Sequence, residues 1–146
     1  MRGLHFRCKI GIQIGESVRS IYCHDGGTPE EVGVVLRDNY DLHQTNELLK
    51  LGDMSYLRET PEASNFYARD RELEAYLCEA RDYDTVDAFL AIGPVDYFYL
   101  LTDDGWKVKS SKDVDNYRVV EEFISIDDAL LIKAVYRKPD VKSPKW

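Results

Sequence analysis

Hydrophobic and polar residues alternate at the start of the chain. Between Leu4 and Ile14, apolar residues occupy every second position, and the positions between them are mostly polar. This period of two predicts a strand with one buried face. Gly15-Glu16 then suits a tight two-residue turn, and the apolar residues within 18–24 predict a returning strand. The first element is therefore expected to be a β-hairpin.

Helical signals follow this hairpin. The stretch 28–31, "TPEE", combines an N-cap candidate, a proline at the first helical position and a glutamate at the capping-box position. It predicts a helix that reaches about Tyr40. Asp41 is placed to cap a second helix over 42–51, and Gly52 is placed to end it.

The middle of the chain is harder to interpret. The segment 53–66 shows no clear period and is expected to be irregular. In 71–80, "RELEAYLCEA", helical spacing and strict alternation both fit. We favour a strand there, because a hairpin-rich sheet needs a further partner. Asp84 or Thr85 can then cap a short helix, which the Gly-Pro pair at 93–94 would close.

The clearest hairpin lies near residue 100, where "VDYFYLL" and "WKVK" flank an Asp-Asp-Gly turn at 103–105. The stretch 117–123 is a further strand candidate, and Asp127-Asp128 predict the start of a last helix with basic residues at its C-terminal end. These elements predict an α+β fold: a mainly antiparallel sheet built from hairpins, with three to four helices packed on it.

Length and composition set further limits. The chain has 146 residues, of which 44% are hydrophobic, so one domain with its own core is expected over 1–137. The stretch 138–146 is expected to be a basic, flexible tail. No apolar run of about 18 residues and no signal-peptide pattern occurs, which predicts a cytoplasmic protein that does not enter membranes.

The net charge of −8, from 27 acidic and 19 basic residues, disfavours general nucleic-acid binding, because a basic surface must neutralise the phosphates. It remains compatible with a small anionic ligand held by a few arginines. No CxxC or HxxxH pair accompanies the three cysteines and three histidines, so neither a metal site nor a cofactor is expected.

Cys23-His24-Asp25 is the first candidate for chemistry. Adjacent residues of a strand point to opposite faces, so Cys23 and His24 are not expected to form a nucleophile–base pair. A two-residue first turn would place Cys8 opposite Cys23, whereas a three-residue turn would place it opposite His24. Acid–base work by His24 with Asp25 stays open, although turn formation is the commoner role of Asp-Gly. An enzyme is the less favoured class.

Anion binding is the second candidate. Gly26-Gly27 precede the helix start at Thr28, where unpaired backbone N–H groups would favour a phosphate. Arg69 and Arg71 would share one face of an extended segment and could clamp that phosphate. The alternative is that neighbouring acidic residues pair with these arginines on a solvated surface.

Aromatic residues complete the expected site. Tyr67 or Trp106 would stack on a base, although aromatic residues on a sheet more often pack in the core. The expected ligand-binding residues are therefore His24, Asp25, Gly26, Gly27, Thr28, Tyr67, Arg69, Arg71 and Trp106, and none is expected to be catalytic.

Four motifs, in order, resemble a family of small phage and prophage proteins. Its members read roughly "IYCHWDGYPE", "LGDLSSL", "YHRDRGE" and "YLFDDGKWYV", and this chain has "IYCHDGGTPE", "LGDMSYL", "YARDREL" and "YFYLLTDDGWKV". The match spans most of 10–109. Asp25, Thr28, Ala68 and Glu72 depart from the tryptophan, tyrosine, histidine and glycine of the family pattern.

The resemblance extends to phage anti-defence proteins of the Thoeris type, which act as sponges for cyclic ADP-ribose signals. It implies a phage-encoded protein that binds and sequesters a nucleotide-derived immune signal without chemistry, as a homodimer or higher homo-oligomer in the host cytoplasm. The alternatives are an acidic protein–protein inhibitor of a host defence enzyme and a small hydrolase or nuclease with His24 as its base.

Overall fold

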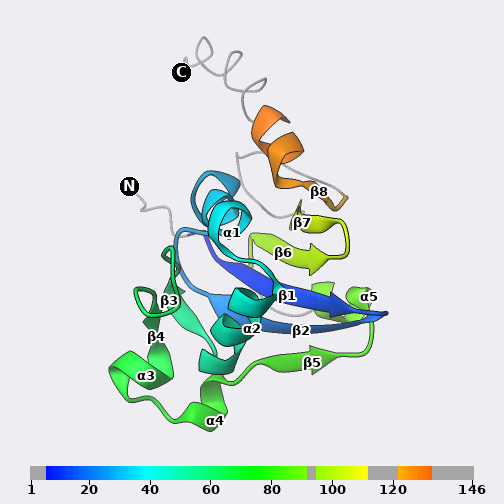
Figure 1. Ribbon diagram of the computed structural model, residues 1–146. Coiled ribbons are helices and arrows are strands. Elements are labelled where there is room, and N and C mark those ends of the chain that lie inside the picture. The colour runs from blue at the N-terminus through cyan, green and yellow to red at the C-terminus, as the bar shows by residue number, and fades with distance from the viewer. Residues whose placement is uncertain (1–5, 92–94, 112–121, 133–146) are drawn as a thin grey trace, which may run out of the picture.

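The computed structural model describes residues 6–91, 95–111 and 122–132 (Figure 1). Its sheet contains eight strands: β1 (Cys8–Ile14), β2 (Ser17–Cys23), β3 (Met54–Tyr56), β4 (Asn65–Phe66), β5 (Arg81–Tyr83), β6 (Tyr97–Thr102), β7 (Gly105–Ser110) and β8 (Ile124–Ser125). The helices are η1, a π-helical turn (Pro29–Gly33), α1 (Val34–Asn39), α2 (Leu42–Leu51), α3 (Tyr67–Arg71), α4 (Ala75–Cys78) and α5 (Val86–Leu90). A last helical segment follows β8.

The strand order is β4-β3-β2-β1-β6-β7-β8, and β5 also pairs with β2. Most neighbours are antiparallel, but β1 with β6 and β2 with β3 are parallel. The predicted α+β fold with a mainly antiparallel sheet is confirmed. None of the described helices has the length and apolar character needed to span a bilayer.

Two apolar layers cover the sheet. On one face, Ile10, Ile21 and Tyr99 pack with Leu36 of α1 and Leu48 of α2. On the other face, a smaller cluster joins Val18, Phe98 and Leu100 to Phe89 of α5. Figure 1 shows α2 lying across the β1–β2 hairpin, with α5 beyond the far side of the sheet. Because side chains alternate between the two faces of each strand, the strands contribute residues to two separate cores.

Both predicted hairpins are confirmed. Ile14 pairs with Ser17 across a two-residue turn, and this register places Cys8 opposite Cys23. The turn begins with Gly15 at φ 63°, a conformation that glycine adopts without strain. In the second hairpin, β6 and β7 pair in the same manner around the predicted Asp-Asp turn.

The predicted second helix is also confirmed. The side chain of Asp41 accepts a hydrogen bond of 2.8 Å from the amide of Gln44, and Gly52 follows the last turn at φ 87°. Thr85, one of the two proposed caps, accepts from Ala88 at the start of α5. The predicted closure at 93–94, the first five residues of the strand candidate over 117–123 and the tail at 138–146 lie outside the described residues, and residues 122 and 123 do not belong to a strand.

The capping box predicted at 28–31 is wrong. Thr28 is buried, and its side chain forms no capping hydrogen bond. The helical segment begins with the wide turn η1 instead of an α-helix. The backbone explains this, because the Thr28 carbonyl accepts from both Glu31 and Gly33. The Glu31 carboxylate accepts from the Tyr56 hydroxyl rather than folding back onto the helix start.

The strand favoured over 71–80 is wrong as well. Here the chain ends α3 and forms α4, since 81–83 supplies the strand that pairs with β2. The segment 53–66, expected to be irregular, contains β3 and β4. These strands are only three and two residues long, too short to show a period in the sequence.

Candidate functional site

A hollow of about 290 Å³ opens beside the end of β2. The chain continues past Cys23 with the amides of His24 and Asp25 bonded to the carbonyls of Met54 and Ser55, at 3.1 Å each. The opposite wall comes from β4 and α3. The lining residues are His24, Asp25, Ser55, Tyr56, Arg58, Asn65, Tyr67 and Arg71. Four predicted ligand-binding residues, His24, Asp25, Tyr67 and Arg71, therefore come together.

Two arginine–tyrosine stacks flank this hollow. The guanidinium carbon of Arg58 lies 4.8 Å from the ring centre of Tyr56, and that of Arg71 lies 5.3 Å from the ring centre of Tyr67. Neither guanidinium forms an ion pair with a carboxylate of the described residues. By contrast, each of four other arginines pairs with an aspartate: Arg19, Arg37, Arg69 and Arg81. The hollow thus presents two guanidiniums that have no ion-pair partner among the described residues, beside the carboxylate of Asp25, which also lines it.

Both tyrosines of the stacks stay protonated over a wide pH range. Burial raises the pKa of Tyr56, and the nearby carboxylate of Glu31 raises it further. Burial also raises the pKa of Tyr67, against a smaller lowering by Arg71. Each ring is therefore a neutral platform under a guanidinium, which holds the arginine side chain in place without removing its charge.

Gly26 and Gly27 do not offer unpaired amides for a phosphate. The Gly26 amide donates to the Asp25 carboxylate at 2.8 Å, and the Gly27 amide donates to the Phe6 carbonyl at 2.8 Å. Gly26 has φ 73°, and a Cβ at this position would lie 2.7 Å from the Tyr56 ring. Its absent side chain therefore lets Tyr56 pack against the backbone. Thr28 is buried next to these glycines.

Arg69 does not line the hollow. Its guanidinium pairs with Asp70 at 2.8 Å and donates to the carbonyls of Pro61 and Ser64 at 3.1 and 2.6 Å. The bonds to the two carbonyls hold the loop between β3 and β4 against α3. The solvated pairing that we weighed as the alternative thus describes Arg69 but not Arg71. Arg58, and not Arg69, lines the hollow together with Arg71.

Sequence reasoning missed Arg58. It follows a strand too short to recognise, within a segment expected to be irregular. A local signal did exist, because Tyr56-x-Arg58 and Tyr67-x-x-x-Arg71 both place an arginine close to a tyrosine.

Trp106 lies away from the hollow. It is buried in the core, and its indole N–H donates to the Tyr40 carbonyl at 2.8 Å. That bond joins β7 to the connection between α1 and α2. Packing, the alternative role considered for the aromatic residues, therefore describes Trp106, whereas Tyr67 does line the hollow.

The thiols of Cys8 and Cys23 are buried. Burial raises the pKa of Cys8 well above its ordinary value, and its contact with Cys23 raises it further. The Cys23 thiol donates to the Asp25 carbonyl at 3.4 Å, whereas His24 shares a hydrogen bond of 2.8 Å with the Tyr22 hydroxyl. His24 is thus directed to a tyrosine and not to a cysteine. No cluster suited to a metal ion occurs among the residues that the structure describes.

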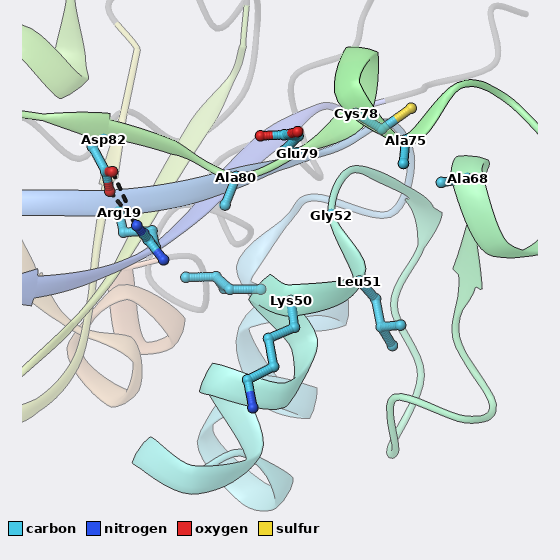
Figure 2. Close-up of a pocket in the computed structure, with 11 residues that line it drawn as sticks. Arg19, Lys50, Leu51, Gly52, Ala68, Ala75, Cys78, Glu79, Ala80 and Asp82 are labelled. Atoms are coloured by element: carbon cyan, nitrogen blue, oxygen red, sulfur yellow. Dashed lines mark hydrogen bonds and ion pairs between the residues drawn. The ribbon is translucent and has the colours of Figure 1, made fainter.

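A larger groove of about 420 Å³ lies between the end of α2 and β5 (Figure 2). Its two cations are already paired, Arg19 with Asp82 at 2.7 Å and Lys50 with Glu47 at 3.2 Å. Much of the remaining wall is made of small residues, Gly52, Ala68, Ala75 and Ala80. The groove has more volume than the hollow but less available charge.

No protein-family model matches this chain, and neither the curated proteins nor the solved structures give a significant match. The function is therefore inferred from the chemistry of the hollow, together with the resemblance described above.

Proposed function

We propose that this protein captures a small anionic, nucleotide-derived molecule in the hollow and holds it without chemistry. The observation that carries the proposal is the pair of arginines, Arg58 and Arg71, each stacked on a tyrosine and neither paired with a described carboxylate. A chain with a net charge of −8 has acidic residues in excess, so two guanidiniums without an ion-pair partner at one hollow favour an anionic ligand.

The side chains of the hollow suit a nucleotide in particular. Guanidinium groups donate two parallel hydrogen bonds to a phosphate, and stacking on Tyr56 and Tyr67 fixes their planes before the ligand arrives. The tyrosine faces can also receive a base. Asp25 and Asn65 supply oxygen acceptors for hydroxyl or amino groups of the same ligand.

We favour capture over turnover because the hollow lacks an activated nucleophile among the described residues. The nearest thiols are buried, and the raised pKa of Cys8 keeps that thiol protonated. His24 lines the hollow, and its Nδ1 atom shares a hydrogen bond with the Tyr22 hydroxyl.

The resemblance to phage anti-defence proteins would make the captured molecule a host immune signal of the cyclic ADP-ribose or cyclic nucleotide type. In that setting the protein would be phage-encoded, would act in the host cytoplasm, and would assemble as a homodimer or larger homo-oligomer.

Calorimetry against cyclic nucleotides and ADP-ribose isomers tests the proposal. We expect heat from at least one phosphate-bearing ligand at one site per chain, and recovery of that ligand unchanged after the protein is denatured by heat. Absence of heat across the panel would contradict capture, and recovery of a product would replace capture with an enzymatic activity.

Inhibition of a host defence protein is a second candidate, favoured by the surface between α3 and α4. Leu73, Tyr76 and Leu77 have exposed fractions of 50%, 70% and 58%. Exposed glutamates, Glu72, Glu74 and Glu79, lie among them. Partner capture through this surface would be strongly salt-dependent and would survive alanine at both hollow arginines.

A further inference from the structure

Two strands share the outer edge of β2 and leave a gap between them. β5 pairs with Val18 to Ser20, whereas β3 pairs with Cys23 only. The amide of Tyr22 falls in this gap. It donates to the side chain of Asp53, with 2.9 Å between the Tyr22 nitrogen and the Asp53 Oδ1 atom. A carboxylate thus replaces the missing strand at this point of the sheet.

Asp53 joins four elements in all. Its Oδ2 atom accepts from the Arg81 guanidinium of β5 at 3.3 Å, and its backbone amide donates to the Cys78 carbonyl of α4 at 2.7 Å. Its own carbonyl accepts from the Tyr67 amide of α3 at 3.2 Å. The residue has an exposed fraction of only 8%. Asp53 is not among the residues that line the hollow.

Two of these contacts continue directly into the walls of the hollow. The ring of Tyr22 carries the hydroxyl that bonds His24 at 2.8 Å. The amide that bonds the Asp53 carbonyl belongs to Tyr67, whose ring supports Arg71. Movement of Asp53 would consequently shift both walls.

We propose that Asp53 is a positioning residue for the hollow, which holds the walls formed by His24 and Tyr67 from behind. This role rests on the proposed function of the hollow, because it assigns Asp53 no contact with the ligand. A neutral acceptor would satisfy the Tyr22 amide, so the charge itself serves the contact with Arg81.

The carboxylate also makes this arrangement sensitive to pH. Burial raises the pKa of Asp53, and the Tyr22 amide and the Arg81 guanidinium only partly offset that increase. The ionisable side chains that interact with it are Tyr67 on α3, Cys78 on α4 and Arg81 on β5, and β2 contributes the backbone amide of Tyr22. Asp53 therefore becomes protonated at a higher pH than an ordinary aspartate, and protonation weakens its bonds to Tyr22 and Arg81.

Two variants separate the charge from the acceptor. Asp53→Asn keeps an oxygen for the Tyr22 amide and removes the charge, whereas Asp53→Ala removes both. Nuclear magnetic resonance between about pH 7.5 and about pH 4 follows the Tyr22 amide, which reports the carboxylate directly, and the ring protons of Tyr67, which report the wall. Inorganic pyrophosphate serves as the probe of capture in the same samples.

In the wild-type protein we expect the Tyr22 amide and the Tyr67 ring to change with one midpoint, above the ordinary range for aspartate. Asp53→Asn should abolish this shared transition and keep the pyrophosphate affinity at pH 7.5 within about threefold, and Asp53→Ala should weaken it about tenfold. A Tyr67 ring that does not follow the Tyr22 transition, or an affinity at pH 7.5 that Asp53→Ala leaves unchanged, would overturn the role of Asp53.

The same experiment keeps the two proposals apart. If pyrophosphate and the nucleotide panel bind at no pH, the proposed function of the hollow fails. The Tyr22 and Tyr67 signals still decide in that case whether Asp53 sets the position of the wall.

Discussion

The hollow and the groove lie at two places along the outer edge of β2, and they differ in what their cations contact. The groove is larger, about 420 Å³ against about 290 Å³. Its Arg19 and Lys50 are paired with carboxylates, whereas Arg58 and Arg71 of the hollow stack on tyrosines. The comparison teaches that the larger of the two cavities does not present the more available cations, which is why the proposal rests on the hollow.

The difference has a local origin. Lys50 meets Glu47 one turn earlier on α2, and Arg19 meets Asp82 across a strand pair, so secondary structure alone places opposite charges together. Around the hollow the neighbours of each arginine are aromatic. A tyrosine face attracts a guanidinium by about 0.5–1 kcal/mol at an exposed site and leaves its N–H groups able to donate to a ligand.

Removal of the cations should separate the two regions most strongly. Arg58→Ala with Arg71→Ala should weaken capture of the panel ligand at least about a hundredfold, because each lost charged hydrogen bond contributes about 1.5–3 kcal/mol. Calorimetry measures this loss. The matched variant, Arg19→Ala with Lys50→Ala, should change the affinity less than about twofold. Equal losses in both variants would remove the distinction between hollow and groove.

Each region contains one glycine with positive φ, which offers a second contrast. Gly26→Ala would push against the Tyr56 ring, so we expect about 2 kcal/mol less unfolding free energy and about tenfold weaker capture. In the groove, the new Cβ of Gly52→Ala would meet the Cys78 carbonyl, so this variant should have a lower unfolding free energy and unchanged capture. Urea unfolding and calorimetry on the folded fractions check both. Unchanged capture in Gly26→Ala would show that the Tyr56 platform is dispensable.

Sequence patterns predicted the parts of this fold that local physics decides. The first hairpin follows from alternation and a glycine turn, and α2 follows from its Asp41 cap and Gly52 end. The segment 71–80 was wrongly assigned to a strand, because both spacings fit and the true partner of β2 follows directly after it. The secondary structure of this segment depends on which residues pair with β2 in the folded protein.

The candidate site shows the same division. His24 and Tyr67 were identified from their motifs and lie in the hollow. Local patterns could not show that Arg58 lines the hollow in place of Arg69. Arg69 donates instead to carbonyls of the loop between β3 and β4, and no sequence pattern predicts the conformation of that loop. Gly26 was expected to bind a phosphate. Its actual contact, with the Tyr56 ring, could not be predicted, because the two residues are far apart in the sequence.

The opposite face of the sheet supplies a test in which stability should change while capture does not. Lys9 is buried there, with its ammonium 3.2 Å from the Phe89 carbonyl and over the Tyr83 and Phe89 rings. Burial lowers its pKa to about 8. Because the unfolded chain keeps this proton up to a higher pH, the stability contributed by Lys9 should rise from about pH 8 to about pH 10.5.

The measurement compares urea unfolding of wild type and Lys9→Met at about pH 7.5 and about pH 10. Relative to the variant, the wild type should gain on the order of 1–2 kcal/mol at the higher pH. A constant difference would show that the Lys9 pKa is not lowered. Both proteins should bind the panel ligand equally at about pH 7.5, since Lys9 lies outside the hollow.

The smallest expected effect concerns the residue after Arg71. Glu72 has φ 58°, in the left-handed region that favours glycine, so Glu72→Gly should raise the unfolding free energy by about 0.5–1 kcal/mol. Glu74, at φ −61°, is the matched control, and glycine there should lower it by a similar amount. Thermal unfolding measures both. Weaker capture in Glu72→Gly would mean that this conformation also positions Arg71.

The central claim is that Arg58 and Arg71 share one anionic ligand. Nuclear magnetic resonance of the arginine side-chain Nε–H groups, during titration with the panel ligand that gives heat, tests it most directly. We predict that the Arg58 and Arg71 signals shift together with a single dissociation constant, while that of Arg19 stays in place. Movement of Arg19 alone, or separate constants for the two hollow arginines, would contradict the account.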